Sequence, residues 1–247
     1  MKIFEIDINC DVGEGVGNEA ELFPYISSCN IACGGHAGDV KTMQSVVKLA
    51  KQHNVKIGAH PSYPDKANFG REVMDISKED LIQSIRSQLK VFENVLRAEH
   101  AHLHHIKAHG ALYNRTTKDL ETARIYLEAI IPYRNKAIFY APFRSVVAKL
   151  AETEGFKVWH ETFADRNYNS DLSLVSRKNQ NALIEEPEKV LDHVLCMVKN
   201  GAVLAVDGRT VEIKTDTLCV HGDTPSALEI LMYLSSELPK NQVNIQK

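Results

Sequence analysis

The sequence predicts an α/β fold, a single seven-stranded β/α barrel of the TIM-like kind. Short β-rich runs alternate with amphipathic helical stretches along the whole chain of 247 residues, which is typical of a parallel sheet. A histidine or an acid follows nearly every predicted strand, as the active-site loops of such barrels require. No linker or repeat divides the chain, so we expect one domain over residues 1–247. An open doubly wound sheet is the alternative.

The first two thirds of the chain give six strands and the helices between them. Asp39 stands as an N-cap before apolar residues at helical spacing. Ser77 and Asp80 form a capping-box signature. The loop over 60–76 is long and contains Pro, Gly and Tyr, which suits a functional loop. Strands are predicted at 2–8, 29–32, 55–59, 103–108, 137–141 and 156–160, and helices at 19–26, 39–50, 77–96, 119–131 and 143–154.

The last third of the chain is predicted to complete the barrel. Pro187 opens a helix, since proline is favoured in a first helical turn. A strand at 202–206 ends at Asp207, and 211–220 forms a further strand or hairpin. Thr224 and Pro225 then cap a helix that runs to Leu238. We expect the polar tail, 239–247, to be frayed.

Composition excludes several classes of protein. The net charge of -3 and a pI near 6.4 give no electrostatic basis for binding nucleic acid. No apolar run reaches the roughly 18 residues of a membrane span, and the N-terminus carries acids where a signal peptide has an apolar segment. Five cysteines without a Cys-x-x-Cys pair favour reduced thiols in a cytoplasmic protein.

The candidate functional residues stand just after the predicted strands, where a barrel gathers its active site. Phosphate-loop, G-x-S-x-G and H-E-x-x-H motifs are absent from the sequence. Acid–base chemistry on a water molecule by Asp and His is therefore the expectation. The candidates are Asp11, Glu14, His36, Asp39, His60, Lys107, His109, Asp165, Arg166, Asp207, His221 and Asp223.

Each candidate also has a plainer interpretation. Asp11 is flanked by glycines and can be a turn former, and Asp39 can be an N-cap alone. Lys107 inside a strand is costly unless it is paired, so we expect an anionic partner or ligand there. A metal ion is possible, because His36, His60 and Asp11 offer suitable ligand atoms.

At these residues the sequence resembles the LamB/YcsF proteins, the family described as the A subunit of the bacterial ATP-hydrolysing 5-oxoprolinase. The matching blocks occur in order along most of the chain, which makes the resemblance highly specific. They run from Asp11 to Gly15, Asn30 to Asp39, Gly58 to Asp65, Asn68 to Arg71, Lys107 to Asn114, Phe163 to Tyr168 and Cys219 to Asp223.

The resemblance implies a barrel akin to those of glycoside hydrolases and deacetylases. The implied reaction converts 5-oxo-L-proline, ATP and water into L-glutamate, ADP and phosphate, with two partner subunits, B and C. ATP, with Mg²⁺, would be handled partly by those partners. The implied catalytic residues are Asp11, His36, His60 and His109, and the implied substrate-binding residues are Glu14, Asp39, Lys107, Asp165, Arg166, His221 and Asp223.

The chain departs from the family pattern at three positions. Gly35, Ala108 and Ser176 stand where the family form has Phe, Pro and Pro. Two other functions are compatible with the residues: a stand-alone metal-dependent deacetylase or amidase, and a non-catalytic component that binds a lactam, a sugar or an acid. A firmly bound transition metal would favour the former, and the many ionisable side chains count against the latter.

Overall fold

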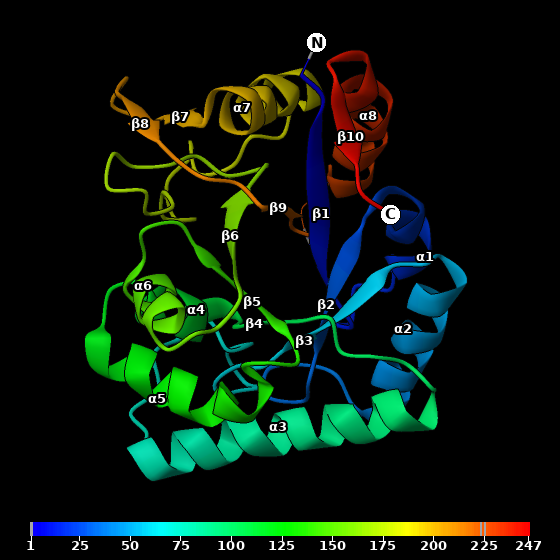
Figure 1. Ribbon diagram of the computed structural model, residues 1–247, viewed down its shortest axis with the longest axis vertical. Helices are drawn as coiled ribbons and strands as arrows, with labels where there is room; N and C mark the ends of the chain where they lie inside the picture. The colour runs from blue at the N-terminus through cyan, green and yellow to red at the C-terminus, as the bar shows by residue number, and fades with distance from the viewer. Residues whose placement is uncertain (1, 223, 225) are drawn as a thin grey trace.

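The protein is described by a computed structural model over residues 2–222, 224 and 226–247. Within this part of the chain, seven parallel strands close into a barrel, because β1 (Phe4–Val12) pairs with both β2 (Ser28–Ala32) and β9 (Thr217–Val220) (Figure 1). The predicted seven-stranded β/α barrel is therefore confirmed. In order around the barrel the strands are β1 (Phe4–Val12), β2 (Ser28–Ala32), β3 (Lys56–His60), β4 (His105–Lys107), β5 (Ile138–Pro142), β6 (Val158–Phe163) and β9 (Thr217–Val220).

Helices surround the barrel, and two of them start at the caps read from the sequence. The last helix has Ser226 as its N-cap instead of the predicted Thr224, and Pro225 lies outside the described residues. The Asp39 carboxylate accepts a hydrogen bond from the Thr42 amide, and Ser77 accepts one from the Asp80 amide. No helix in the described part is both long and apolar enough to cross a membrane. The helices are α1 (Glu19–Leu22), α2 (Val40–Gln52), α3 (Lys78–Ala98), α4 (Gly110–Thr116), α5 (Leu120–Ile130), α6 (Val146–Thr153), α7 (Pro187–Asn200) and α8 (Ala227–Lys240), with 3₁₀ turns at Phe23–Tyr25 and Ile131–Tyr133.

Strand β1 shows why the barrel interior is polar. Its residues alternate, so one set faces the helices and the other faces the barrel axis. Ile6 and Ile8 are fully buried in the apolar core shared with the helices. Asp7, Asn9 and Asp11 point inward and make contacts across the barrel. Barrel interiors are ordinarily filled by Val, Ile and Leu, so this polar axis is unusual.

The polar interior is arranged in layers along the axis. At the end of the barrel where the strands begin, here called the lower end, Asp7 accepts hydrogen bonds from the hydroxyls of Ser28, Thr217 and Tyr140. In the middle the Asn30 side chain donates to Asn9 and accepts from His105.

Gly58 makes room for this middle layer. A Cβ at Gly58 would lie 2.0 Å from His105 Nε2, so only glycine fits there. The uppermost layer contains Asp11, Lys107 and Glu161.

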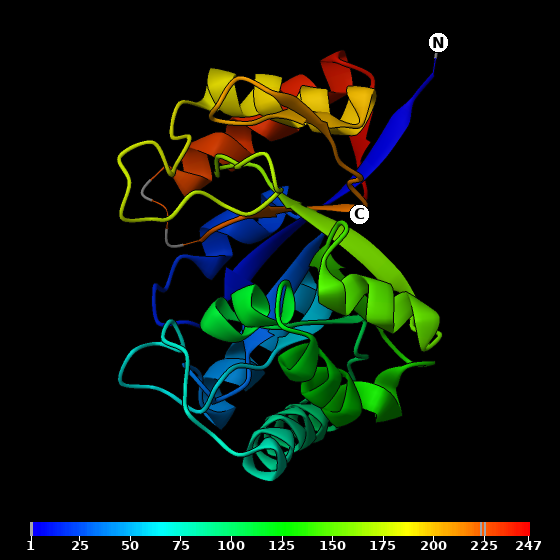
Figure 2. The same cartoon turned by 90° about the vertical axis from the view of Figure 1, so that its left-hand side faces the viewer.

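The loops that follow the barrel strands gather at one end. Figure 2 shows the loops after β1, β3 and β6 on the same side of the molecule, at its left. Parallel strands place all of their carboxyl ends at one rim. Most of the strand-end residues chosen from the sequence therefore gather at a common mouth.

Two strand predictions were inaccurate. Strand β1 continues to Val12, so Asp11 lies inside the strand rather than in the loop after it. The segment 202–206 was expected in the barrel, but β7 (Ala202–Leu204) pairs antiparallel with β8 (Thr210–Glu212) in a separate hairpin. Asp207 consequently lies in an exposed turn, bonded to Arg209, and not at the mouth.

The prediction for the tail was wrong. Helix α8 extends to Lys240, and β10 (Val243–Ile245) follows it. Strand β10 pairs with the first residues of β1, and Val243 is fully buried. The tail therefore extends the sheet at the lower end of the barrel. Helix α4, directly after His109, was not predicted.

Candidate active site

Two histidines at the mouth have fixed tautomers. His60 ends β3, and its Nδ1 lies 2.9 Å from the Lys107 carbonyl oxygen. His109 caps α4, and its Nε2 lies 3.0 Å from the Phe69 carbonyl oxygen. Because a carbonyl oxygen only accepts, these nitrogens carry the protons. The other ring nitrogens, His60 Nε2 and His109 Nδ1, therefore present lone pairs, and they face each other at 3.0 Å.

The loop after β3 holds His109 in place. The Gly70 carbonyl oxygen accepts from the Ala111 amide, and the His109 amide donates to the Pro61 carbonyl. A Cβ at Gly110 would lie 2.6 Å from the Gly70 carbonyl oxygen. This close approach requires glycine, which also adopts the positive φ of 56° found there.

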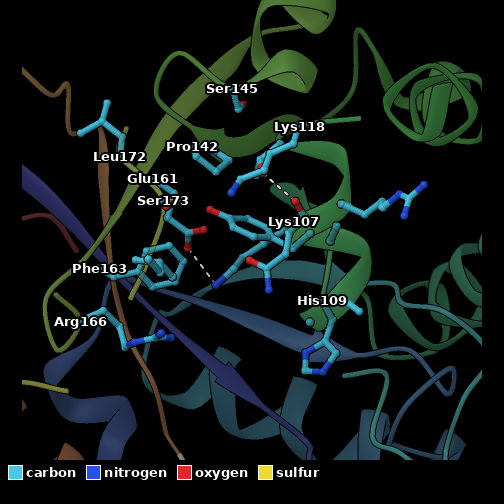
Figure 3. Close-up of a pocket in the computed structure, with 18 of the residues that line it drawn as sticks. Lys107, His109, Lys118, Pro142, Ser145, Glu161, Phe163, Arg166, Leu172 and Ser173 are labelled. Carbon is cyan, nitrogen blue, oxygen red and sulfur yellow. Dashed lines mark hydrogen bonds and ion pairs between the residues drawn. The ribbon is translucent and has the colours of Figure 1, made fainter. Parts of the chain in front are cut away.

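Lys107 is the buried cation of the site, and it is doubly paired. Its ammonium lies 2.9 Å from Asp11 Oδ1 and 2.8 Å from Glu161 Oε1. Figure 3 shows Lys107 and Glu161 pointing toward each other across the pocket. Burial alone would lower the pKa of Lys107, but Asp11, Cys219 and Glu161 outweigh it and raise that pKa well above its ordinary value. The anionic partner expected for this lysine is therefore present.

His36 supports the site from behind. Its Nε2 lies 2.9 Å from Glu14 Oε1, and its ring stacks on the His109 ring at 3.6 Å between centroids. Burial lowers the pKa of His36 to about 4 and also lowers the pKa of His109, so both rings are neutral near pH 7. A neutral His36 donates to Glu14 through Nε2. Unlike His60 and His109, His36 does not line the pocket, so it acts on the site through Glu14.

A second carboxylate–histidine pair lies on the other side of the mouth. His221 Nδ1 is 2.9 Å from Asp165 Oδ1, and the Thr224 hydroxyl also donates to Asp165. Burial would raise the pKa of Asp165, but His221 and Thr224 outweigh it and lower that pKa. The carboxylate orients the imidazole and leaves Nε2 for another partner, an arrangement suited to proton transfer.

These groups surround a pocket of about 1150 Å³. Its floor contains Asp11, Glu14, His60, His109 and His221. Its remaining wall is rich in cations, which suits an anionic ligand. The basic residues on that wall are Arg71, Arg115, Lys118, Arg144, Arg166, Arg177 and Lys178.

Some candidates lie elsewhere or are already engaged. Asp39 is exposed at the N-cap of α2 and does not line the pocket. Arg166 lines the pocket, but two of its nitrogens donate to the Val175 and Ala182 carbonyls and so fasten the loop after β6. Asp223 lies outside the described residues.

The departure from the family pattern at Gly35 has a structural counterpart. A Cβ at Gly35 would lie 2.4 Å from Ser62 Oγ and 2.5 Å from Gln88 Oε1. The Gln88 side chain bonds both the amide and the carbonyl of Ser62. A polar side chain from α3 thus fills the space beside Gly35.

Sequence reasoning missed the inward partners of the site. Glu161 pairs with Lys107, and Asn30 donates to Asp11 at 2.7 Å. The available signal was the period-two spacing of polar residues, as in Asp7, Asn9 and Asp11. Polar residues repeated at that spacing in an otherwise apolar strand indicate a polar interior.

The structure also defines which side chains have atoms close enough to hold a metal ion. Asp11, Glu14, His60 and His109 each offer one ligand atom, and these atoms lie within 4.8 Å of one another. The set proposed from the sequence contained His36 in place of Glu14 and His109. His36 is not a member of this group.

Comparison with known proteins agrees with this architecture. The model of the LamB/YcsF family matches residues 6–247. A Pyrococcus abyssi protein, named as the A subunit of 5-oxoprolinase, is 44% identical over 245 residues, which is 97% of this chain and 96% of that protein. A Haemophilus influenzae protein of the same name is 40% identical, with 98% of each chain covered.

A solved structure is similar over the same length. The lactam utilization protein from Thermus thermophilus superposes with a TM-score of 0.92 at 35% identity, covering 98% of this chain and 99% of that one. With a family model that spans nearly all of the sequence and relatives at this level of identity, the chain belongs to the LamB/YcsF family.

Proposed function

We propose that this chain is the catalytic subunit of an ATP-dependent 5-oxoprolinase, which opens 5-oxo-L-proline to L-glutamate together with two partner subunits, B and C. The observation that carries the proposal is the full-length similarity to relatives named as the A subunit of 5-oxoprolinase. The mouth supports it, because acid–base side chains and a buried lysine surround one pocket there.

The chemistry explains why ATP is required. A five-membered lactam is a stable amide, and phosphorylation of its oxygen makes the carbonyl carbon open to attack by water. A first water forms a C–O bond to that carbon while the C–N bond breaks and the ring nitrogen gains a proton, which leaves an acyl phosphate. A second water then hydrolyses the acyl phosphate to the carboxylate and inorganic phosphate. The sequence has no phosphate-binding loop, so the partner subunits supply part of the ATP site. The cationic wall of the pocket suits a phosphorylated lactam.

Each step of this reaction is assigned to particular side chains of the pocket. Asp11 and His60 fix the attacking water at the floor of the pocket. The Lys107 ammonium stabilises negative charge that develops on the substrate oxygen. His221, oriented by Asp165, carries a proton between the water and the ring nitrogen. His36 stacks on His109 and donates to Glu14, and Arg166 fastens the loop after β6 beside the substrate.

The test is 5-oxoproline-dependent ATP hydrolysis by the chain reconstituted with its partner subunits. We expect Asp11→Asn and His109→Ala to lower turnover by more than about 100-fold, the usual scale for lost acid–base groups, while folding is retained. Asp207→Asn, in the exposed hairpin, is the matched control and should keep full activity. Wild-type rates in both site variants would refute the site assignment, and inactivity of the wild-type complex on a range of lactams would refute the function.

A second function is favoured by the potential metal ligands at the mouth. A stand-alone metal-dependent amidase would use Asp11, Glu14, His60 and His109 without ATP. Lactam opening by the isolated chain with a divalent metal and no nucleotide would establish this alternative. An absolute requirement for ATP and the partner subunits would exclude it.

A further inference from the structure

Two histidine nitrogens at the mouth face each other without a hydrogen atom between them. The Lys107 and Phe69 carbonyls fix the protons of His60 and His109 on the far side of each ring. His60 Nε2 and His109 Nδ1 then face each other at 3.0 Å as two acceptors. Acceptors at hydrogen-bond distance repel unless a positive species lies between them.

Two carboxylates meet at the same point. Asp11 Oδ2 lies 3.3 Å from His60 Nε2, and Glu14 Oε1 lies 3.3 Å from His109 Nδ1. The other Asp11 oxygen is already bonded to Asn30 and Lys107, so Oδ2 is the one directed at the histidines. Four electron-pair donors, two nitrogens and two oxygens, therefore converge.

The charge balance is incomplete in this part of the structure. Asp11, Glu14 and Glu161 contribute three negative charges, whereas Lys107 contributes one positive charge. Among these ion-paired groups, the negative charges exceed the positive charge by two, and the groups are largely buried. Buried charge without compensation is costly.

From this convergence we propose that Asp11 Oδ2, Glu14 Oε1, His60 Nε2 and His109 Nδ1 bind one divalent transition-metal ion of the zinc or cobalt type. Nitrogen and carboxylate ligands suit these ions, and a mutual spacing within 4.8 Å fits a small coordination sphere. Each histidine donates its remaining N–H to a backbone carbonyl, which is how metal-binding histidines are usually oriented. The ion would face the pocket, because all four residues line it.

The test uses the full chain by itself, without lactam or ATP. The protein is stripped with a chelator, dialysed against Zn²⁺ or Co²⁺, and analysed for metal content and thermal unfolding. We expect one ion per chain, a visible Co²⁺ absorption band and a higher Tm in the loaded protein, since binding to the folded state alone stabilises it.

The variants identify the ligands. His60→Ala and His109→Ala should weaken metal binding by more than about 100-fold, because even second-layer partners cost about 10–100-fold. His221→Ala is the matched control, a pocket histidine outside the four, and should bind one ion normally. If a histidine variant fails to fold, Asp11→Asn provides the same readout.

The possible outcomes are distinct. A wild-type chain that takes up no ion would show that a proton bridges the two histidines and would overturn the proposal, as would equal binding by all variants. Metal binding is measured without turnover, so an inactive complex that still binds one ion would refute only the proposed 5-oxoprolinase function. A bound ion by itself favours the metal-dependent amidase, and an absolute requirement for ATP and the partner subunits, measured separately, decides against it.

Discussion

Asp7 and Asp11 occupy the same strand four residues apart, both point into the barrel, and their surroundings differ. Asp7, at the lower end, receives hydrogen bonds from Ser28 and Thr217 at 2.7 Å and pairs with Lys56 at 3.3 Å. Asp11, at the mouth, receives two donors on Oδ1 but faces only an imidazole lone pair with Oδ2.

The difference distinguishes a buried carboxylate that stabilises the fold from one that remains able to bind a ligand. A buried carboxylate with a complete set of donors holds the strands together. A buried carboxylate beside surplus acceptors gains little stability there and keeps the capacity to bind something else. The lower end of the barrel therefore contributes stability, and the mouth keeps groups available for the proposed chemistry.

The largest expected effect comes from substituting the two acids identically. Asp7→Ala should lower the free energy of unfolding by about 3–5 kcal/mol, because it removes the buried carboxylate that three hydroxyls and an ammonium share. Asp11→Ala should cost less than about 1 kcal/mol, since Lys107 keeps Glu161. Urea unfolding measures both, and equal losses would contradict the contrast between the two ends.

The two lysines extend this comparison. Lys107→Met should lower the free energy of unfolding by about 3 kcal/mol, because Asp11 and Glu161 lose their shared buried cation. Lys56→Met should cost about 1 kcal/mol or less, since the Lys56 side chain is 24% exposed. Adding Glu161→Gln to Lys107→Met should recover part of the loss in urea unfolding; a double variant no more stable than Lys107→Met would argue against the pairing.

The lower end should also respond to acid. The pKa of His104 is lowered to about 4, chiefly by burial; Asp7 opposes this lowering, and Lys56 and Lys157 add to it. His105, whose ring packs against His104, is itself buried and has a lowered pKa. Below pH 6.5, His104 is protonated in the unfolded chain but stays neutral in the folded protein. The free energy of unfolding therefore falls as the pH drops from 6.5 to about 4, and His104 does not affect it above pH 6.5.

The measurement is urea unfolding from pH 7.5 down to pH 4.5. Between these pH values the His104→Gln variant should lose about 2 kcal/mol less free energy of unfolding than the wild type. This value is smaller than the full pKa shift would give, because the ring is partly exposed. The buried histidines other than His105 contribute equally to both proteins, so the difference isolates His104 together with its effect on His105. Parallel pH profiles would contradict this interpretation.

The sequence was sufficient for the barrel and for most of the mouth. Strand–helix alternation and the polar residues after each strand are local signals, and they located His60, His109, Asp165 and His221 correctly at the rim. Their chemical roles remain proposals. The partners of these residues are not local, because Glu161 meets Lys107 only once β4 and β6 lie in one closed barrel.

The errors have a common physical origin. Antiparallel and parallel strands share the same β-rich pattern, so nothing in 202–206 indicated a hairpin outside the barrel. The tail has a polar composition, and its order depends on an unpaired edge of β1 that the sequence does not reveal. Such segments are fixed by distant partners rather than by their own residues.

The smallest expected effect is at that tail, and it tests whether the lower end is purely structural. Val243 is fully buried where β10 meets β1, whereas its neighbour Asn244 is exposed. Val243→Ala should lower the free energy of unfolding by about 1–2 kcal/mol through lost apolar contact and a small cavity, and Asn244→Ala should change it by less than about 0.5 kcal/mol. Neither should alter turnover in the reconstituted complex. A loss of activity in Val243→Ala without a loss of stability would mean that the lower end also communicates with the mouth.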